Sequence, residues 1–136
     1  MAAVGPVCLD LPGAYEEPAW IGTRWRVRGH TFAHVLAIAD GRPNAYAVAA
    51  GSRGPLTVLT IRTSEPERYR GRARRPFFWP GWFPDLLGRV LEAPIDRDAL
   101  APLLLESYCL VAPKRFVREL LDRPDAKIVE PATRLR

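Results

Sequence analysis

Hydrophobic and polar side chains alternate from Thr23 to Ile38, which predicts a β-hairpin with one buried and one exposed face. Glycine tolerates a positive φ, so Gly29-His30 is the predicted two-residue turn. This register collects apolar side chains on one face: Trp25, Val27, Phe32, Leu36 and Ile38. The opposite face presents a row of basic side chains: Arg24, Arg26 and Arg28.

The same register decides what the two histidines of the chain can do. It pairs Arg28 with Thr31 and Trp25 with His34, so that His30 is an exposed turn residue and His34 is partly buried. Because His30 lies in the turn, the two rings do not share a strand face, and we expect no metal site. The sequence also lacks a glycine-rich phosphate loop and a Gly-x-Ser-x-Gly motif, so we expect neither catalysis nor a cofactor.

Further strands are predicted on both sides of a glycine-flanked loop, at residues 45–50 and 56–62. The turn formers at 40–44 separate them from the hairpin. Residues 56–62 are apolar on both faces, which is typical of a central strand. Residues 86–91 would add a fifth strand, and the short connections favour an antiparallel meander.

Helical patterns flank the predicted strands. A short helix is expected near the N-terminus, and another after Ser64, whose side chain is the predicted N-cap. A downstream stripe of leucines predicts a longer helix. Its N-cap is Asp96 or Asp98, with Asp98 favoured because Pro102 then falls in the first turn. A last helix is predicted over residues 113–124.

These elements predict an α+β fold with one compact domain over residues 1–124 and a loosely ordered tail over 125–136. The sheet would contain about five antiparallel strands, with a short N-terminal helix and two C-terminal helices packed on one face. Residues 11–18 are predicted as a connector. Within them we interpret Glu16 and Glu17 as a solvated acidic step before the hairpin rather than as a catalytic carboxylate pair.

The charge of the chain points towards an anionic partner. The formal net charge is +5 and the pI is about 9.8, and nearly all the positive charge is arginine, which suits bidentate contacts with phosphate. A GC-rich genome is an alternative explanation for the arginine content. Cys8 and Cys109 lack metal spacing and are expected to be reduced core residues; a disulfide between them has no support. With no export signal or apolar membrane span, we expect a cytoplasmic protein.

A second basic group is followed directly by aromatic residues. The arginines of this group are Arg68, Arg70, Arg72, Arg74 and Arg75. The aromatic residues are Phe77, Phe78, Trp79, Trp82 and Phe83. Guanidinium groups beside aromatic rings are what single-stranded nucleic acid requires. The favoured alternative is that the rings pack against the sheet, because the chain needs its aromatic residues for a core first.

Three stretches of the chain resemble the MmcQ/YjbR-like family. They are the hairpin at 25–33, the connector at 11–17, and the run ESYCLVAPKR at 106–115, which carries the most specific match. The resemblance implies an antiparallel sheet with helices against one face, and a DNA-binding role for basic hairpins. It implies anion contacts from Arg26, Arg28, His30, Lys114 and Arg115. It also implies that Ser107 and Tyr108 anchor a helix to the sheet.

The chain departs from the family at three places. His30 stands where the family usually has lysine, so that contact becomes pH-dependent or is lost. The N-terminal helix is shorter and interrupted, and an aromatic, proline-rich segment replaces the family's usual sequence after the fourth strand.

The leading hypothesis is a DNA-binding protein of low sequence specificity, whose basic hairpin contacts the phosphate backbone. The residues expected to make these contacts are Arg24, Arg26 and Arg28, assisted by Arg72, Arg74 and Arg75. The alternative is a binding module for an anionic aromatic small molecule or for a protein partner, such as a chaperone-like or resistance accessory protein. Its motivation is the aromatic group Trp79, Trp82 and Phe83.

Overall fold

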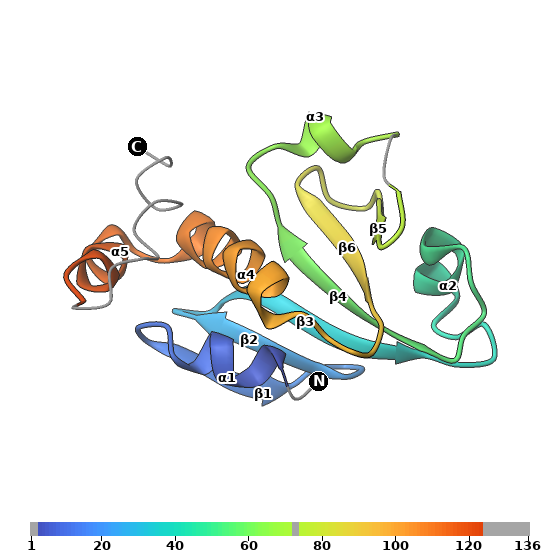
Figure 1. The fold of residues 1–136 in the computed structure, drawn as a ribbon, viewed down its shortest axis with the longest axis horizontal. Helices are drawn as coiled ribbons and strands as arrows, with labels where there is room; N and C mark the ends of the chain where they lie inside the picture. Colours follow the sequence, from blue (N-terminus) through green and yellow to red (C-terminus); the bar gives the residue numbers. More distant parts are fainter. Residues whose placement is uncertain (1–2, 72–73, 124–136) are drawn as a thin grey trace.

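A six-stranded antiparallel sheet organises the chain, whose computed structural model describes residues 3–71 and 74–123 (Figure 1). The strand order is β1-β2-β3-β4-β6-β5. The strands are β1 Ala14–Pro18, β2 Thr23–Val27, β3 His30–Ile38, β4 Leu56–Arg62, β5 Phe77–Phe78 and β6 Leu86–Leu91. The helices are α1 Val4–Leu9, α2 Asn44–Ala50, α3 Pro66–Tyr69, α4 Arg97–Val111 and α5 Lys114–Leu121. The predicted α+β class is confirmed, with six strands in the sheet. The predicted tail at 125–136 lies outside the described residues.

The two faces of the sheet are covered by different helices. Helices α1 and α4 pack on one face, where the largest fully buried side chains include Trp25, Phe32 and Tyr108. Helix α2 packs on the other face, against Leu36 and Val58. The prediction placed all helices on one face because it lacked α2. Burial of both faces of β4 agrees with its predicted central position.

Residues 45–50 form most of helix α2, so the predicted strand at this position is wrong. Four of the seven residues in α2 are alanine, the residue with the highest helix propensity. The helix ends at Gly51, which adopts a left-handed conformation with φ of 69°. The glycine-flanked loop after this segment favoured a hairpin, and so a strand was predicted where the composition favours a helix.

Two short strands were not predicted as strands, and they form the edges of the sheet. β1 comes from the predicted connector and pairs with β2, so that Glu17 lies opposite Arg24. β5 comes from the aromatic segment and pairs with β6, where Phe78 lies opposite Gly88. A Cβ on Gly88 would lie 2.3 Å from the Phe78 ring, so the absence of a side chain makes room for that ring.

The β2–β3 hairpin forms, but its predicted turn is wrong by one residue. The predicted strand pairing is wrong by two residues at Arg26 and Val27 and by one residue at Arg24 and Trp25. The turn is Arg28-Gly29, with φ values of 50° and 82° that suit a type I′ turn. His30 therefore begins β3, opposite Val27. A register shift between Trp25 and Arg26 leaves Phe32 as an extra residue on β3, which is the geometry of a β-bulge.

Ser107 and Tyr108 anchor α4 to the sheet, as predicted. The Ser107 hydroxyl donates to the Phe32 carbonyl at 2.6 Å and accepts from the Arg62 N–H at 2.8 Å. The Ser107 hydroxyl thus joins β3 to β4 at the bulge residue Phe32. The regular pairing of these two strands begins at the next residue, where Ala33 lies opposite Ile61. The Tyr108 ring meets Phe32 of β3 edge-to-face at a centroid distance of 5.4 Å, and its hydroxyl donates to the Pro12 carbonyl in the loop before β1 at 2.6 Å.

Of the two N-caps predicted for α4, the structure has Asp96 and not the favoured Asp98, and the N-cap predicted for α3 is wrong. Helix α4 is capped by Asp96, whose side chain accepts from the N–H groups of Asp98 at 3.0 Å and Ala99 at 3.3 Å, so Pro102 lies inside the helix. Ser64 does not cap α3; its hydroxyl and its N–H both donate to Glu106 on α4. The last helix begins after Pro113 as predicted, but it ends at Leu121, before the predicted end at residue 124.

Candidate nucleic-acid interface

The uncovered face of β1 and β2 carries two arginines that share one carboxylate. The period of two along β2 turns Trp25 and Val27 into the core and leaves Arg24 and Arg26 on the opposite face. Glu17 lies directly across from Arg24 on β1. Its Oε1 atom accepts from Arg24 Nη2 at 2.6 Å, from Arg24 Nε at 2.7 Å and from Arg26 Nη1 at 3.0 Å. Glu17 is therefore an ion-pair partner, which the interpretation as a solvated acidic step missed.

This ion-paired cluster keeps a positive balance, because two guanidinium groups face one carboxylate. Hydrogen bonds from Arg24 and then Arg26 hold the pKa of Glu17 below its ordinary value of 4.5, so the carboxylate is charged at neutral pH. The side chains of Arg24 and Arg26 remain 37% and 24% exposed. The cluster can therefore still meet an anion from solvent.

The hairpin turn adds exposed basic groups at one end of this surface. Arg28 and His30 are both exposed, but Arg28 lies in the turn, so the predicted row of three arginines on one strand face contains only Arg24 and Arg26. Arg26 Nη2 also donates to the Gly29 carbonyl, which ties the arginine side chain to the turn.

Lys114 and Arg115 lie at the same end of the sheet as the hairpin turn. Gly13 approaches Phe116 of α5 so closely that an added Cβ would lie 2.6 Å from the ring, and the next residue, Ala14, pairs with Val27 beside the turn. Figure 1 shows α5 at this end of the molecule. Both basic side chains are exposed, and the Arg115 guanidinium lies 5.1 Å from the Phe116 ring centroid.

The second basic group lies at the opposite edge of the sheet. Arg74 and Arg75 precede β5, four strand positions from β2, or about 19 Å at the usual spacing of about 4.8 Å between strands. Both are exposed, and Arg75 pairs with Glu92 at 2.8 Å. Arg72 lies outside the described residues. The structure therefore does not bring the described members of the two predicted basic groups together.

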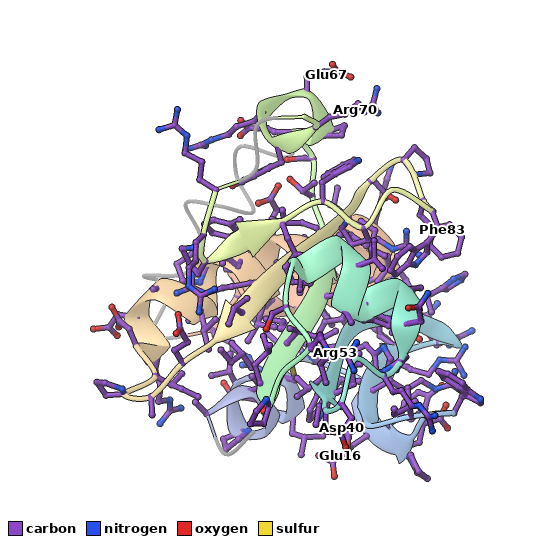
Figure 2. The ribbon with its side chains drawn as sticks, turned by 90° about the vertical axis from the view of Figure 1, so that its right-hand side faces the viewer. Glu16, Asp40, Arg53, Glu67, Arg70 and Phe83 are labelled. Carbon is purple, nitrogen blue, oxygen red and sulfur yellow. The ribbon has the colours of Figure 1, made fainter. Side chains whose placement is uncertain are left out.

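The arginines of α3 and its C-terminal end pair with nearby carboxylates. In Figure 2, Glu67 of α3 and Arg70 directly after it point away from the body of the protein. Their ion pair has a distance of 3.1 Å, and Arg68 pairs with Glu65 at 3.7 Å.

The aromatic segment divides into packed and exposed rings. Phe78 is buried, while Phe77 and Trp79 are partly buried against the core, in agreement with the packing interpretation. Trp82 and Phe83 are 39% and 49% exposed. Figure 2 shows Phe83 at the rim of the molecule, pointing outward beyond α2.

The two exposed rings line a groove of about 230 Å³ over β3 and β4. Tyr46 of α2 contributes a ring that meets Trp82 edge-to-face at a centroid distance of 5.0 Å. The Arg62 guanidinium lies 5.0 Å from the Phe83 ring centroid and is held by Asp85 at 2.7 Å. Sequence reasoning did not select Tyr46 or Arg62, because the first was assigned to a strand and the second only ended one.

The groove and the ion-paired cluster are direct neighbours on the sheet. His34 lines the groove and pairs across strands with Arg24; Thr31 lines it and pairs with Arg26. His34 Nε2 lies 2.6 Å from the carbonyl oxygen of Ile21, and this contact fixes the orientation of the ring. Basic and aromatic side chains thus form one continuous surface, which we call the open face: Arg24, Arg26, Thr31, His34, Tyr46, Arg62, Trp82 and Phe83.

Other kinds of site find little support in the described part of the chain. No group of three or more His, Cys, Asp or Glu side chains is arranged to hold a metal ion among residues 3–71 and 74–123. Cys8 and Cys109 are free thiols, as predicted. Burial raises the pKa of both and brings that of Cys109 to about 11, so neither is a ready nucleophile at neutral pH. Among the helices that the structure describes, none has the length and hydropathy to cross a bilayer.

Comparison with family models, curated proteins and solved structures finds no match to this chain. The resemblance to the MmcQ/YjbR-like family therefore stays a prediction. The class that the fold itself defines is a small α+β domain with one helix-covered face and one partly open, basic and aromatic face.

Proposed function

We propose that this protein binds nucleic acid through the phosphate backbone, with Arg24 and Arg26 as the central contacts and Arg28 and His30 at the edge of the surface. The observation that carries the proposal is the pair of guanidinium groups held side by side by Glu17 on an uncovered strand face. Planar guanidinium groups match phosphate geometry, and a carboxylate that positions both reduces the ordering needed on binding.

Low sequence specificity follows from the same geometry. Every nucleotide presents a phosphate, so contacts from Arg24 and Arg26 fix position without reading bases. A phosphate must compete with Glu17 for the guanidinium groups, and the excess of one positive charge in the cluster favours the added anion. We therefore expect moderate affinity that depends strongly on salt.

The test is fluorescence anisotropy of labelled random oligonucleotides, single-stranded and duplex, repeated across a salt series. The variant carrying both Arg24→Ala and Arg26→Ala should bind more weakly than the unmodified protein. The slope of log affinity against log salt should become shallower by about 0.7 to 0.9 for each phosphate that the variant no longer neutralises. Unchanged affinity and slope would contradict the proposal.

The chain offers a matched control at its other edge. Arg74 and Arg75 are also two neighbouring, exposed arginines, but they lie at the opposite edge of the sheet from Arg24 and Arg26. Changing both to Ala removes the same net charge, so a loss of affinity equal to that of the Arg24 and Arg26 variant would indicate a general charge effect. A loss confined to the Arg24 and Arg26 variant supports the open face.

A second candidate function is binding of an anionic aromatic small molecule. A separate cavity of about 370 Å³ lies between α2 and β5, and its lining includes Phe77, Trp79 and Arg75. Its volume falls within the range of about 300 to 1,000 Å³ that is usual for small-molecule sites. Quenching of tryptophan fluorescence by an indole or benzoate carboxylate, lost in Trp79→Phe, would support this function. A response unchanged by Trp79→Phe would contradict it.

A further inference from the structure

The groove beside the ion-paired cluster has the composition of a base-stacking site. Its rim carries the exposed rings of Trp82 and Phe83, backed by Tyr46, which supports Trp82 edge-to-face. Such rings stack on the bases of single strands with little preference among them, because every base has an aromatic face. The Arg62 guanidinium beside Phe83 adds positive charge at the same place.

The size of the groove limits what can enter it. Its volume of about 230 Å³ is below the roughly 300 Å³ at which sites for drug-sized ligands begin. A single base is a planar group that suits this space. A base within a duplex is paired along one edge and covered by neighbours on both faces, so it cannot offer a face to Trp82 without leaving the stack.

The groove and the ion-paired cluster lie on adjacent strands. His34 and Thr31 in the groove are the cross-strand partners of Arg24 and Arg26, and neighbouring strands lie about 4.8 Å apart. A nucleotide whose phosphate contacts these guanidinium groups can therefore place its base in the groove. Phosphate contact and base stacking then act on the same strand.

We infer that the groove between Trp82, Phe83 and His34 holds one unpaired nucleobase, so that the ligand is single-stranded nucleic acid; this rests on the proposed function. The phosphate contacts alone do not distinguish a single strand from a duplex. The groove makes that distinction, because only an unpaired base can enter it.

The experiment compares a labelled 12-mer with its duplex by anisotropy, using the unmodified protein, Trp82→Ala and Phe83→Ala. The unmodified protein should bind the single strand more tightly, and loss of Trp82 should weaken single-strand binding by roughly 10-fold or more while leaving duplex binding unchanged. Leu110→Ala is the matched control, because Leu110 is 40% exposed on α4, the helix that covers the opposite face.

A second measurement uses the unmodified protein and does not depend on how well the variants fold. A single strand containing 2-aminopurine should lose fluorescence on binding if that base stacks on a protein ring. Absence of quenching at every position of the probe would overturn the inference.

The outcomes separate the inference from the function on which it rests. Equal affinity for strand and duplex, or single-strand binding unaffected by Trp82→Ala, would overturn the base site and leave phosphate binding in place. Binding to neither probe at low salt would overturn both. Strand preference that Trp82→Ala abolishes and Leu110→Ala preserves supports both.

Discussion

The two faces of strand β2 differ in what their side chains are needed for. Trp25 and Val27 are buried beneath α1 and α4, and they belong to the main core. Arg24 and Arg26 lie on the other face and are partly exposed beside Glu17. The folded state therefore depends on one face, while the basic side chains of the other are available for a ligand. Substitutions on the two faces should affect different measurements.

The largest expected effect is on stability, at the helix-covered face. Leu104 is fully buried in α4 within the main core. Leu104→Ala removes buried methyl groups and leaves a cavity, so it should lower the free energy of unfolding by about 2–5 kcal/mol. Urea denaturation followed by circular dichroism measures this change. A loss no greater than that of an exposed substitution would show that α4 is not packed on the sheet as described.

The next effect concerns the hydroxyl that joins β3, β4 and α4. Ser107→Ala leaves the Phe32 carbonyl and the Arg62 N–H without their partner, so we expect a loss of about 1–3 kcal/mol in the free energy of unfolding. Ser64→Ala is the control, because that hydroxyl is exposed and water can replace its bond to Glu106. If both variants lower the free energy of unfolding by the same amount, the buried position of Ser107 does not account for its contribution to stability.

The smallest expected effect is on the open face and depends on pH. The pKa of Glu17 is lowered in the folded state, chiefly by hydrogen bonds from Arg24 and Arg26, so its contribution to stability is present above the ordinary pKa of 4.5. That contribution is lost as the pH falls through the lowered value. Glu17→Gln should therefore be slightly less stable than the unmodified protein at pH 7 and equally stable at strongly acidic pH. A difference that grows with acidification would contradict this sign.

The sequence was most informative where local pattern and tertiary packing agree. The alternation along β2 predicted which side chains enter the core, and the leucine stripe predicted α4. The helix-to-sheet role of Ser107 and Tyr108 came from the family resemblance. The hydrogen bonds of Ser107 to β3 and β4 confirm it, whereas Tyr108 meets the sheet through its ring and hydrogen-bonds to the loop before β1.

The errors come from features that short-range pattern does not determine. The turn moved by one residue because Arg28 adopts a positive φ, which is uncommon for a residue other than glycine. Helix α2 was predicted as a strand because a glycine-flanked loop follows it, which is typical of a hairpin, although its alanines favour a helix.

The candidate site required contacts between distant parts of the chain. Glu17 reaches Arg24 and Arg26 only once β1 is known to pair with β2. The groove needs Tyr46 from α2 and Trp82 from the loop before β6, which meet only in the folded chain. The composition could indicate that basic and aromatic groups are abundant, but it could not show which of them share a surface.

The most direct test of the open face as a phosphate-binding surface compares two opposite charge changes in one cluster. Affinity for a labelled single strand would be measured at one low salt concentration for the unmodified protein, for Glu17→Gln, and for the variant with Arg24→Ala and Arg26→Ala. Glu17→Gln removes the competing negative charge but keeps an acceptor oxygen that can still position the guanidinium groups, so it should bind more tightly, while the double arginine variant should bind more weakly. If the two variants bind as the unmodified protein does, nucleic acid does not contact this face.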